Sequence, residues 1–248
     1  VGRQGRQMLA ALLALLLLAG AAAAWLKVNP LQLLRWQPLP PLDPTGWQQA
    51  VQLPWPALIG GTLLLALTAA GLAVGSGPLL LLWVAPWRWG RALLQLGWIL
   101  GRLWPPPLTA LLLLLLLKPG LLPAALALGL HNLGILGRLL HEAIESANPG
   151  PEQALRSSGS GPRLALLYGR YSAVARSYLA YGAYRSDVML RETVVVGLVG
   201  GTGLGSQLRE SLSAFAWQQI ALLLVAYALL TLVGEDLSDR SRRQLLGA

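Results

Sequence analysis

Long apolar segments constrain this chain more than any other feature, because a segment of that length must be buried in lipid or in protein. The hydrocarbon core of a bilayer is about 30 Å thick, so a helix needs roughly 20 apolar residues to cross it. Met8 to Trp25 and Trp55 to Val74 are two such segments. Hydrophobic residues make up 55% of the chain and charged residues only 12%, which argues against an ordinary soluble domain. We therefore expect an all-helical protein that crosses a membrane several times.

The distribution of basic residues predicts about six spans, with both termini on the cytoplasmic side. Arg-rich loops face the cytoplasm, and the C-terminal tail joins the other basic loops on that side only if the charged stretch 171–199 also crosses. A proline triplet at 105–107 should break the third span, because proline lacks the backbone N–H and clashes with the preceding turn. The expected spans are Met8–Trp25, Trp55–Val74, Ala92–Leu117, Leu121–Leu140, Tyr171–Val199 and Phe215–Val233.

The same pattern predicts three regions. Residues 1–55 should form an anchor helix and a periplasmic segment, 56–243 a transmembrane core, and 244–248 a short tail. The first apolar segment can also be interpreted as a cleaved signal peptide, since the alanines before Trp25 resemble a cleavage region. We favour an uncleaved anchor because further spans follow.

A polar segment interrupts the apolar regions between His141 and Gly159, within a predicted cytoplasmic loop near 141–170. It reads as the end of one helix, a turn at Asn148-Pro149-Gly150, and a second short helix that Gly159 ends. A helix-turn-helix on the Arg-rich side suits contact with a soluble partner. An ordinary solvated loop with mixed charges is the alternative.

Ionisable residues inside the fifth span are costly in lipid and should face the bundle interior or an aqueous path. Asp187 and Arg191 are four residues apart, and Arg185 and Glu192 are seven apart, so each pair lies on one helix face. One interpretation is a translocation path in which Arg185, together with Arg191, lowers the barrier for an anion. The other is two internal ion pairs that fix helix packing.

Several kinds of site are disfavoured by the sequence. The chain has no Cys and only two His residues, His131 and His141, so no metal-site spacing is present, and no nucleophile–base set for catalysis is recognisable. We interpret His131 as a packing residue bonded to a neighbouring helix. The net charge of +9 would suggest a nucleic-acid partner in a soluble protein, but here Arg-rich loops that orient membrane helices explain it.

A glycine cluster follows the fifth span, but its spacing fits neither a Walker loop nor a dinucleotide fingerprint. Close helix packing and a gate-like break at the outer end of the span fit it better. The glycines are Gly197, Gly200, Gly201, Gly203 and Gly205.

Three segments resemble the permease subunits of binding-protein-dependent ATP-binding-cassette importers, most of all the phosphonate permeases. They are His131–Arg138 continuing into Glu142–Glu145, Pro149–Gly159, and Tyr184–Arg191 followed by Gly197–Gly205. The second segment is similar to the family's coupling loop, with Gln153 and Leu155 where the superfamily usually has Glu and Ala. Tyr171-Ser172 and Pro105-Pro106 also depart from the family's usual Leu-Pro and Pro-Glu pairs.

This resemblance implies a transporter subunit of the bacterial inner membrane, with lipid around it and no cofactor of its own. ATP and Mg would bind a separate ATPase subunit, an external binding protein would deliver the cargo, and a second copy of the chain would complete a homodimer. It implies coupling to the ATPase through Glu152, Gln153, Ala154, Leu155, Arg156 and Gly159, and a translocation path that includes Arg185, Asp187, Arg191 and Glu192.

The expected cargo is phosphonate or a related phosphorus oxyanion. Phosphite, phosphate and a methionine-like solute are alternatives on the same architecture. A membrane enzyme that modifies lipids is an alternative of another class, for which the acidic groups Glu142, Glu145 and Glu152 lack a matching His or metal set.

Overall fold

The computed structural model describes residues 3–25, 44–87 and 89–247, in which all regular structure is helical. The chain forms two compact units, residues 1–41 and 42–248. The elements are α1 (Arg3–Trp25), α2 (Pro44–Val51), α3 (Trp55–Val84), α4 (Gly90–Leu103), α5 (Pro106–Leu114), α6 (Leu121–Ser146), α7 (Gly150–Ser157), α8 (Pro162–Ala165), a π-helical segment (Leu166–Tyr171), α9 (Ser172–Val199), α10 (Leu204–Ser213) and α11 (Trp217–Leu246).

The first unit contains α1, whose part from Gln7 to Trp25 is long and apolar enough to cross a membrane. Its leucine side chains are exposed, as expected for a helix whose solvent is lipid. Most of the predicted periplasmic segment lies at 26–43, outside the described residues, so the predicted boundary near residue 55 stays a prediction.

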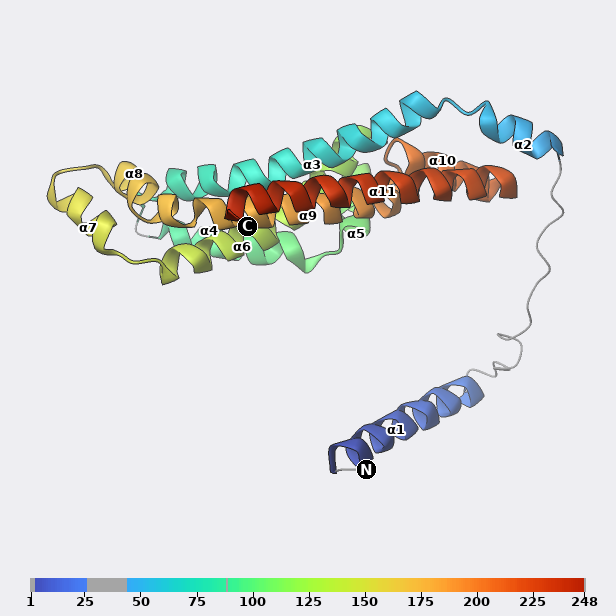
Figure 1. The fold of residues 1–248 in the computed structure, drawn as a ribbon, viewed down its shortest axis with the longest axis horizontal. Coiled ribbons are helices and arrows are strands. Elements are labelled where there is room, and N and C mark those ends of the chain that lie inside the picture. Colours follow the sequence, from blue (N-terminus) through green and yellow to red (C-terminus); the bar gives the residue numbers. More distant parts are fainter. Residues whose placement is uncertain (1–2, 26–43, 88, 248) are drawn as a thin grey trace. The chain divides into compact units, whose positions relative to one another are not determined.

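Helix α6 is the central element of the second unit, where it packs against α3, α4, α5 and α9 (Figure 1). Small residues line its contacts. A Cβ atom added at Gly134 would lie 2.6 Å from the backbone oxygen of Trp98 on α4, so the two helices touch backbone to backbone. In lipid, where the hydrophobic effect does not drive helices together, such close packing supplies much of the attraction between them.

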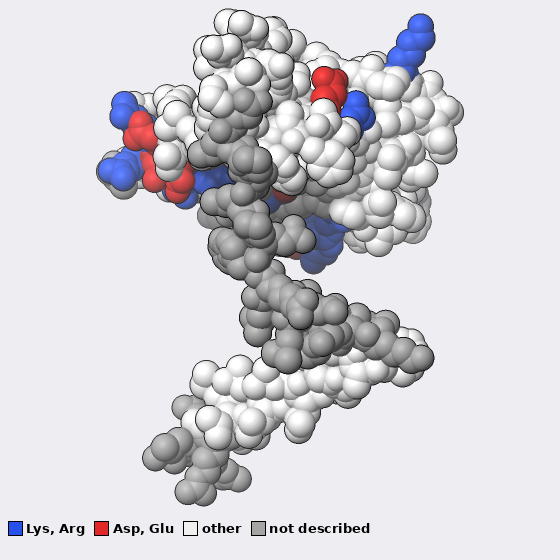
Figure 2. Space-filling view, turned by 90° about the vertical axis from the view of Figure 1, so that its right-hand side faces the viewer, with Lys and Arg blue, Asp and Glu red and all other residues white. Residues whose placement is uncertain are grey.

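Among the described residues, four helices are long and apolar enough to cross a membrane, or five if a bent pair counts as one span. The four are Gln7–Trp25, Trp55–Val84, Leu121–Ser146 and Trp217–Leu246; the pair is Pro162–Val199 with Leu204–Ser213, bent by 42°. Five of the six expected spans therefore correspond to candidate spans in the structure. The exposed face in Figure 2 is mostly uncharged, which fits a membrane environment.

The expected third span differs most. It is two separate helices, α4 and α5, divided at Trp104 and Pro105, and neither passes as a span by length and composition. Trp98 of α4 contacts Gly137 of α6, and Ala110 of α5 clusters with Ala124. The two short helices therefore run one after the other along α6 in the opposite direction, and together they cover most of its length.

Helix α3 continues ten residues beyond the expected end at Val74, and a hydrogen bond from Tyr178 explains the continuation. Pro78 lies inside α3 and cannot donate a hydrogen bond to the carbonyl of Val74, four residues back. The Tyr178 hydroxyl of α9 donates to that carbonyl at 2.7 Å. Gly77 leaves room for the phenol ring. A tertiary contact thus satisfies a backbone group that the sequence leaves open, so α3 runs to Val84.

Helix α11 is also longer than the expected sixth span, because it continues past Val233 to Leu246. Charged side chains along this extension form ion pairs within one helical turn. Arg240 lies 2.6 Å from Asp236. Such pairs support a helix outside the apolar window, where hydropathy alone gives no signal.

We predict that Gly134→Ala destabilises the protein by about 1–3 kcal/mol relative to Gly97→Ala. Both substitutions gain the same helix propensity, but the new methyl group meets backbone at position 134 and open space at position 97. Thermal unfolding of the two variants in detergent measures the difference. Equal shifts in the unfolding temperature would contradict the close α4–α6 packing.

Candidate functional site

The predicted helix-turn-helix is confirmed. Helix α6 ends at Ser146, the backbone N–H of Gly150 donates to the Asn148 side chain at 2.9 Å, and α7 follows. Gly159 has a φ of +88°, a left-handed conformation that L side chains rarely adopt. Gln153, Ala154 and Arg156 are exposed and Leu155 is partly buried. This surface is available to another molecule.

Glu152 differs from the other predicted coupling residues because it is buried, with 3% of its surface exposed. Its Oε1 lies 2.7 Å from Arg156 Nη2 and its Oε2 lies 2.7 Å from Arg170 Nε, so the carboxylate forms ion pairs with both arginines. A carboxylate so far from water needs such partners. We call the group Glu152, Arg156 and Arg170 the Glu152 clasp.

The Glu152 clasp joins α7 to the π-helical segment that leads directly into α9. A Cβ atom added at Gly169 would lie 2.6 Å from the Cα atom of Glu152, so the two segments touch at their backbones. A π-helical turn holds one more residue than an α-helical turn, and such turns are frequent at functional sites. Helix α7 is therefore in direct contact with the segment that precedes α9.

The predicted pair Arg185–Glu192 lies against α6, where Asn132 joins it. Arg185 Nε donates to Asn132 Oδ1 at 3.0 Å, and the Asn132 amide donates to Glu192 Oε2 at 3.2 Å. Arg185 Nη2 lies 3.9 Å from Glu192 Oε1, which is longer than a hydrogen bond. Asn132 is fully buried, and 13% of the Arg185 side chain is exposed. We call these three residues the Arg185 cluster.

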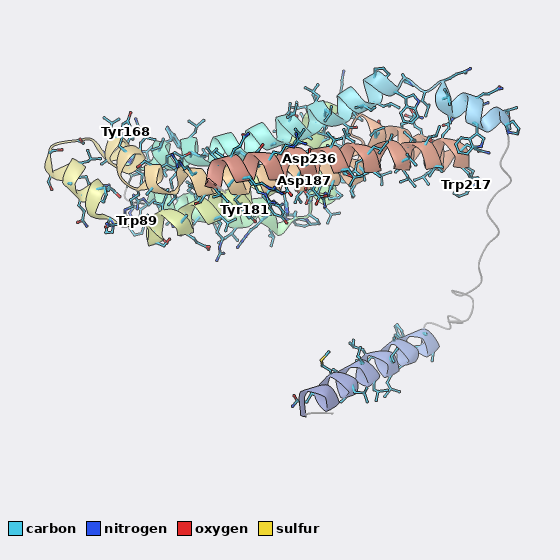
Figure 3. All side chains as sticks on the ribbon, in the orientation of Figure 1. Trp89, Tyr168, Tyr181, Asp187, Trp217 and Asp236 are labelled. Carbon is cyan, nitrogen blue, oxygen red and sulfur yellow. The ribbon has the colours of Figure 1, made fainter. Side chains whose placement is uncertain are left out.

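The predicted pair Asp187–Arg191 is a separate group between α9 and α11. Arg191 Nη2 lies 2.8 Å from Asp187 Oδ2 and 3.1 Å from Glu235 Oε2. Figure 3 places Asp187 about midway along the long helices. The four residues predicted for a translocation path are thus divided into two groups, of which only the Arg185 cluster adjoins the central helix α6.

The predicted glycine cluster forms the bend between α9 and α10. Gly200 and Gly203 have positive φ values, 146° and 81°. A Cβ atom on Gly197 would lie 2.7 Å from the Cα atom of Gly205, so the two helices touch across the bend. Gly201 also abuts Gly197. The geometry supports close packing; a role as a gate stays a prediction.

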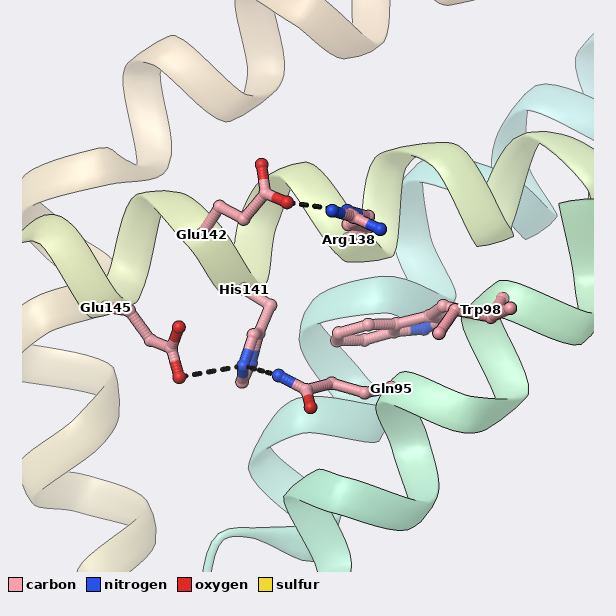
Figure 4. A pocket seen from close by; sticks show the side chains of 7 residues that line it. Gln95, Trp98, Arg138, His141, Glu142 and Glu145 are labelled. Atoms are coloured by element: carbon pink, nitrogen blue, oxygen red, sulfur yellow. Dashed lines mark hydrogen bonds and ion pairs between the residues drawn. The ribbon is translucent and has the colours of Figure 1, made fainter.

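A cavity of about 230 Å³ lies between α4 and α6 (Figure 4). His141 Nε2 is 2.9 Å from Glu145 Oε1, and Arg138 Nε is 2.6 Å from Glu142 Oε1. These polar side chains are therefore partnered with each other. No three His, Cys, Asp or Glu side chains in the described part of the chain are placed to hold a metal ion. His131 Nδ1 donates a hydrogen bond to the Trp104 carbonyl, 3.1 Å away at the end of α4, as expected for a packing residue bonded to a neighbouring helix.

The sequence reasoning missed three polar residues that complete these groups. They are Asn132, Arg170 and Glu235. Of the three, only Asn132 has a signal in the sequence, because it is an amide in the middle of an apolar segment. Nothing local indicates Arg170 or Glu235, because their partners lie on other helices.

Residues 68–245 match the protein family described as "Binding-protein-dependent transport system inner membrane component". The chain is 37% identical over 142 residues to a putative phosphite transport system permease protein of Stutzerimonas stutzeri, covering 57% of this chain and 54% of that protein. It is 37% identical over 145 residues to a phosphate-import permease protein of Mycolicibacterium smegmatis, covering 58% and 27%. A putative cryptic phosphonate transport system permease protein of Escherichia coli K12 is 35% identical over 121 residues, covering 49% and 99%.

The chain thus spans about half the length of the phosphite relative. Among solved structures, an amino acid transporter of the ATP-binding-cassette class, crystallised with histidines, superposes with a TM-score of 0.63. The match covers 83% of this chain and 100% of that chain, at 19% sequence identity. At this identity the match shows a shared fold and nothing about cargo.

We predict that Glu152→Ala destabilises the α7 region by about 3–5 kcal/mol, because it leaves two arginines without their carboxylate. Hydrogen exchange across residues 150–171 measures this local stability. Glu142→Ala is the matched control: it removes a similar pair whose side chains are about half exposed, and it should cost less than about 1 kcal/mol. Equal protection in both variants would show that the clasp does not hold α7.

Proposed function

Because the chain belongs to the family of inner membrane components of binding-protein-dependent transport systems, we propose that it imports phosphonate or a related phosphorus oxyanion. It would act as the membrane permease of an ATP-driven importer. The permeases reported above carry names that specify phosphite, phosphate and phosphonate, which supports this class of cargo. The Arg185 cluster supplies the hydrogen-bond donors that would bind such an anion.

The proposal rests on the surroundings of Arg185. Its guanidinium lies in the bundle interior, its hydrogen bonds go to the neutral Asn132, and the nearest carboxylate is 3.9 Å away. A guanidinium offers five N–H donors in a planar fork that suits tetrahedral oxyanions. Donors not used by Asn132 can meet a passing anion, while Glu192 offsets the charge when the path is empty. Asp187, Arg191 and Glu192 complete the proposed path.

The energy for transport would come from another subunit. We assign ATP and Mg to a separate ATPase subunit, which docks on the exposed residues Gln153, Ala154 and Arg156 of α7, on the partly buried Leu155, and on the turn at Gly159. The Glu152 clasp then transmits movement of α7 to α9, the helix that carries Arg185. A shift of packed helices about such a contact is a known way to switch a transporter.

Two further partners complete the proposal. An external binding protein delivers the cargo, in keeping with the description of the family. A second copy of the chain encloses the path, since a single bundle leaves large apolar faces of α3 and α11 exposed. Lipid covers the remaining apolar surface.

We predict that Arg185→Ala lowers uptake of the cargo roughly 10- to 100-fold, because it removes charge-assisted hydrogen bonds to the anion. The chain is reconstituted in liposomes with its ATPase and binding protein, and uptake of radiolabelled phosphonate, phosphite and phosphate is measured. Arg185→Lys should retain part of the activity.

The matched control is Arg240→Ala, which removes an arginine from an exposed ion pair on α11. It should import at the wild-type rate. If an assembled complex imports none of the three oxyanions, the cargo is another solute. Normal uptake by Arg185→Ala would remove Arg185 from the path.

We predict that Gly159→Val prevents the ATPase from copurifying with this chain. A β-branched residue at a φ of +88° is strained, so the end of α7 must rearrange. Gly161→Val is the control, because Gly161 has a φ of −62° and open space around it.

Ala154→Trp tests the same surface without backbone strain, since it adds bulk to an exposed position. Loss of copurification in both Gly159→Val and Ala154→Trp supports docking at α7. Retention in both would place the ATPase contact elsewhere.

A further inference from the structure

A cleft of about 510 Å³ lies beside α7, between the α3–α4 connection, the first turn of α4 and the π-helical segment. This volume is in the range of small-molecule sites. Trp87 and Arg91 line one side, and Glu152, Gln153, Arg156 and Arg170 line the other. The cleft therefore contains the Glu152 clasp, but it extends beyond the clasp to α4.

Positive charge exceeds negative charge in this cleft, because three arginines face a single carboxylate. Both oxygens of Glu152 are already engaged, by Arg156 at 2.7 Å and by Arg170 at 2.7 Å. Arg91 has no ion pair with any described residue. The Arg170 side chain is only 20% exposed, so its charge is poorly screened by water.

Donors for an anion remain after the clasp has formed. Arg156 and Arg170 each have five N–H groups and use few of them on Glu152. The Gln153 amide lines the same cleft, and no side chain caps the first turn of α4, whose dipole is positive at that end. Planar guanidinium groups that converge from different elements suit a tetrahedral oxyanion, to which they can donate two hydrogen bonds each.

We propose that this cleft binds a phosphoryl oxyanion, with Arg91 as its uncommitted ligand and Arg156 and Arg170 as shared ligands. The anion can be free, as inorganic phosphate, or part of an anionic lipid headgroup; the chemistry of recognition is the same. This inference goes beyond the proposed cargo and stands on the residues of the cleft alone. Occupancy would draw Arg156 and Arg170 toward the anion, so the site is linked to the position of α7.

The test measures binding of radiolabelled inorganic phosphate to the full chain in nanodiscs of net-neutral lipid. The ATPase is left out so that its nucleotide site does not contribute, and every measurement is repeated in an Arg185→Ala background so that the proposed path does not contribute either. Saturable binding is expected, and Arg91→Ala should weaken it about tenfold or more. Arg91→Lys, which keeps the charge but not the fork, should fall between the two.

Arg163→Ala is the matched control, because Arg163 is an exposed arginine on nearby α8 that does not line the cleft. It should bind phosphate like the wild type, and thermal unfolding shows that each variant is folded. Absence of saturable binding, or equal binding by Arg91→Ala and the wild type, would overturn the proposal.

A second set of nanodiscs with anionic phospholipid identifies the source of the anion. If headgroups occupy the cleft, phosphate binding falls relative to neutral lipid, and Arg91→Ala removes that competition. If free oxyanion is the ligand, binding is the same in both lipids. A chain that binds phosphate here but imports no phosphorus oxyanion would keep this inference and reject the proposed cargo.

Discussion

Close packing around α6 is the constraint on which the rest of the structure depends. Gly134 lets α4 approach to backbone contact, Gly137 makes room for the Trp98 ring, and Gly129 admits α3. In a membrane this packing replaces the hydrophobic effect as the force that joins helices. Because α6 is held so tightly, the residues it carries are fixed in position. Asn132 is one of them, and the turn into α7 is its direct continuation.

Two polar groups connect that core to the proposed function. The Arg185 cluster joins α6 to α9 through Asn132, and the Glu152 clasp joins α7 to the segment that precedes α9. Both groups therefore act on the same helix, one within the bundle and one at its end. A partner that moves α7 would shift α9 through a buried ion pair and a backbone contact at Gly169. This arrangement would link the proposed docking surface on α7 to Arg185 through α9 alone.

Hydropathy identified the spans whose exposed faces are apolar along their whole length. It did not predict the ends and breaks of helices that depend on a contact with a neighbouring helix. Proline gives opposite results in two places. At residues 105–107 three successive prolines lack a backbone N–H, and α4 and α5 separate although His131 bonds the Trp104 carbonyl. At Pro78 the Tyr178 hydroxyl bonds the freed carbonyl, and α3 continues to Val84. The sequence shows both prolines but contains no local signal for the tyrosine, which lies 100 residues further along the chain.

The sequence by itself determined the class of protein, the place of α7 and its end near Gly159, because these follow from composition and short-range backbone chemistry. It also determined the pair Asp187–Arg191, since residues four apart on a helix are neighbours. Only the tertiary structure decided that Glu152 is buried, that Asn132 and Arg170 are the partners of charged groups, and that Arg91 lines the same cleft as Glu152 without an ion pair to a described residue. These depend on which helices come together, and that is set by packing between residues far apart in the chain.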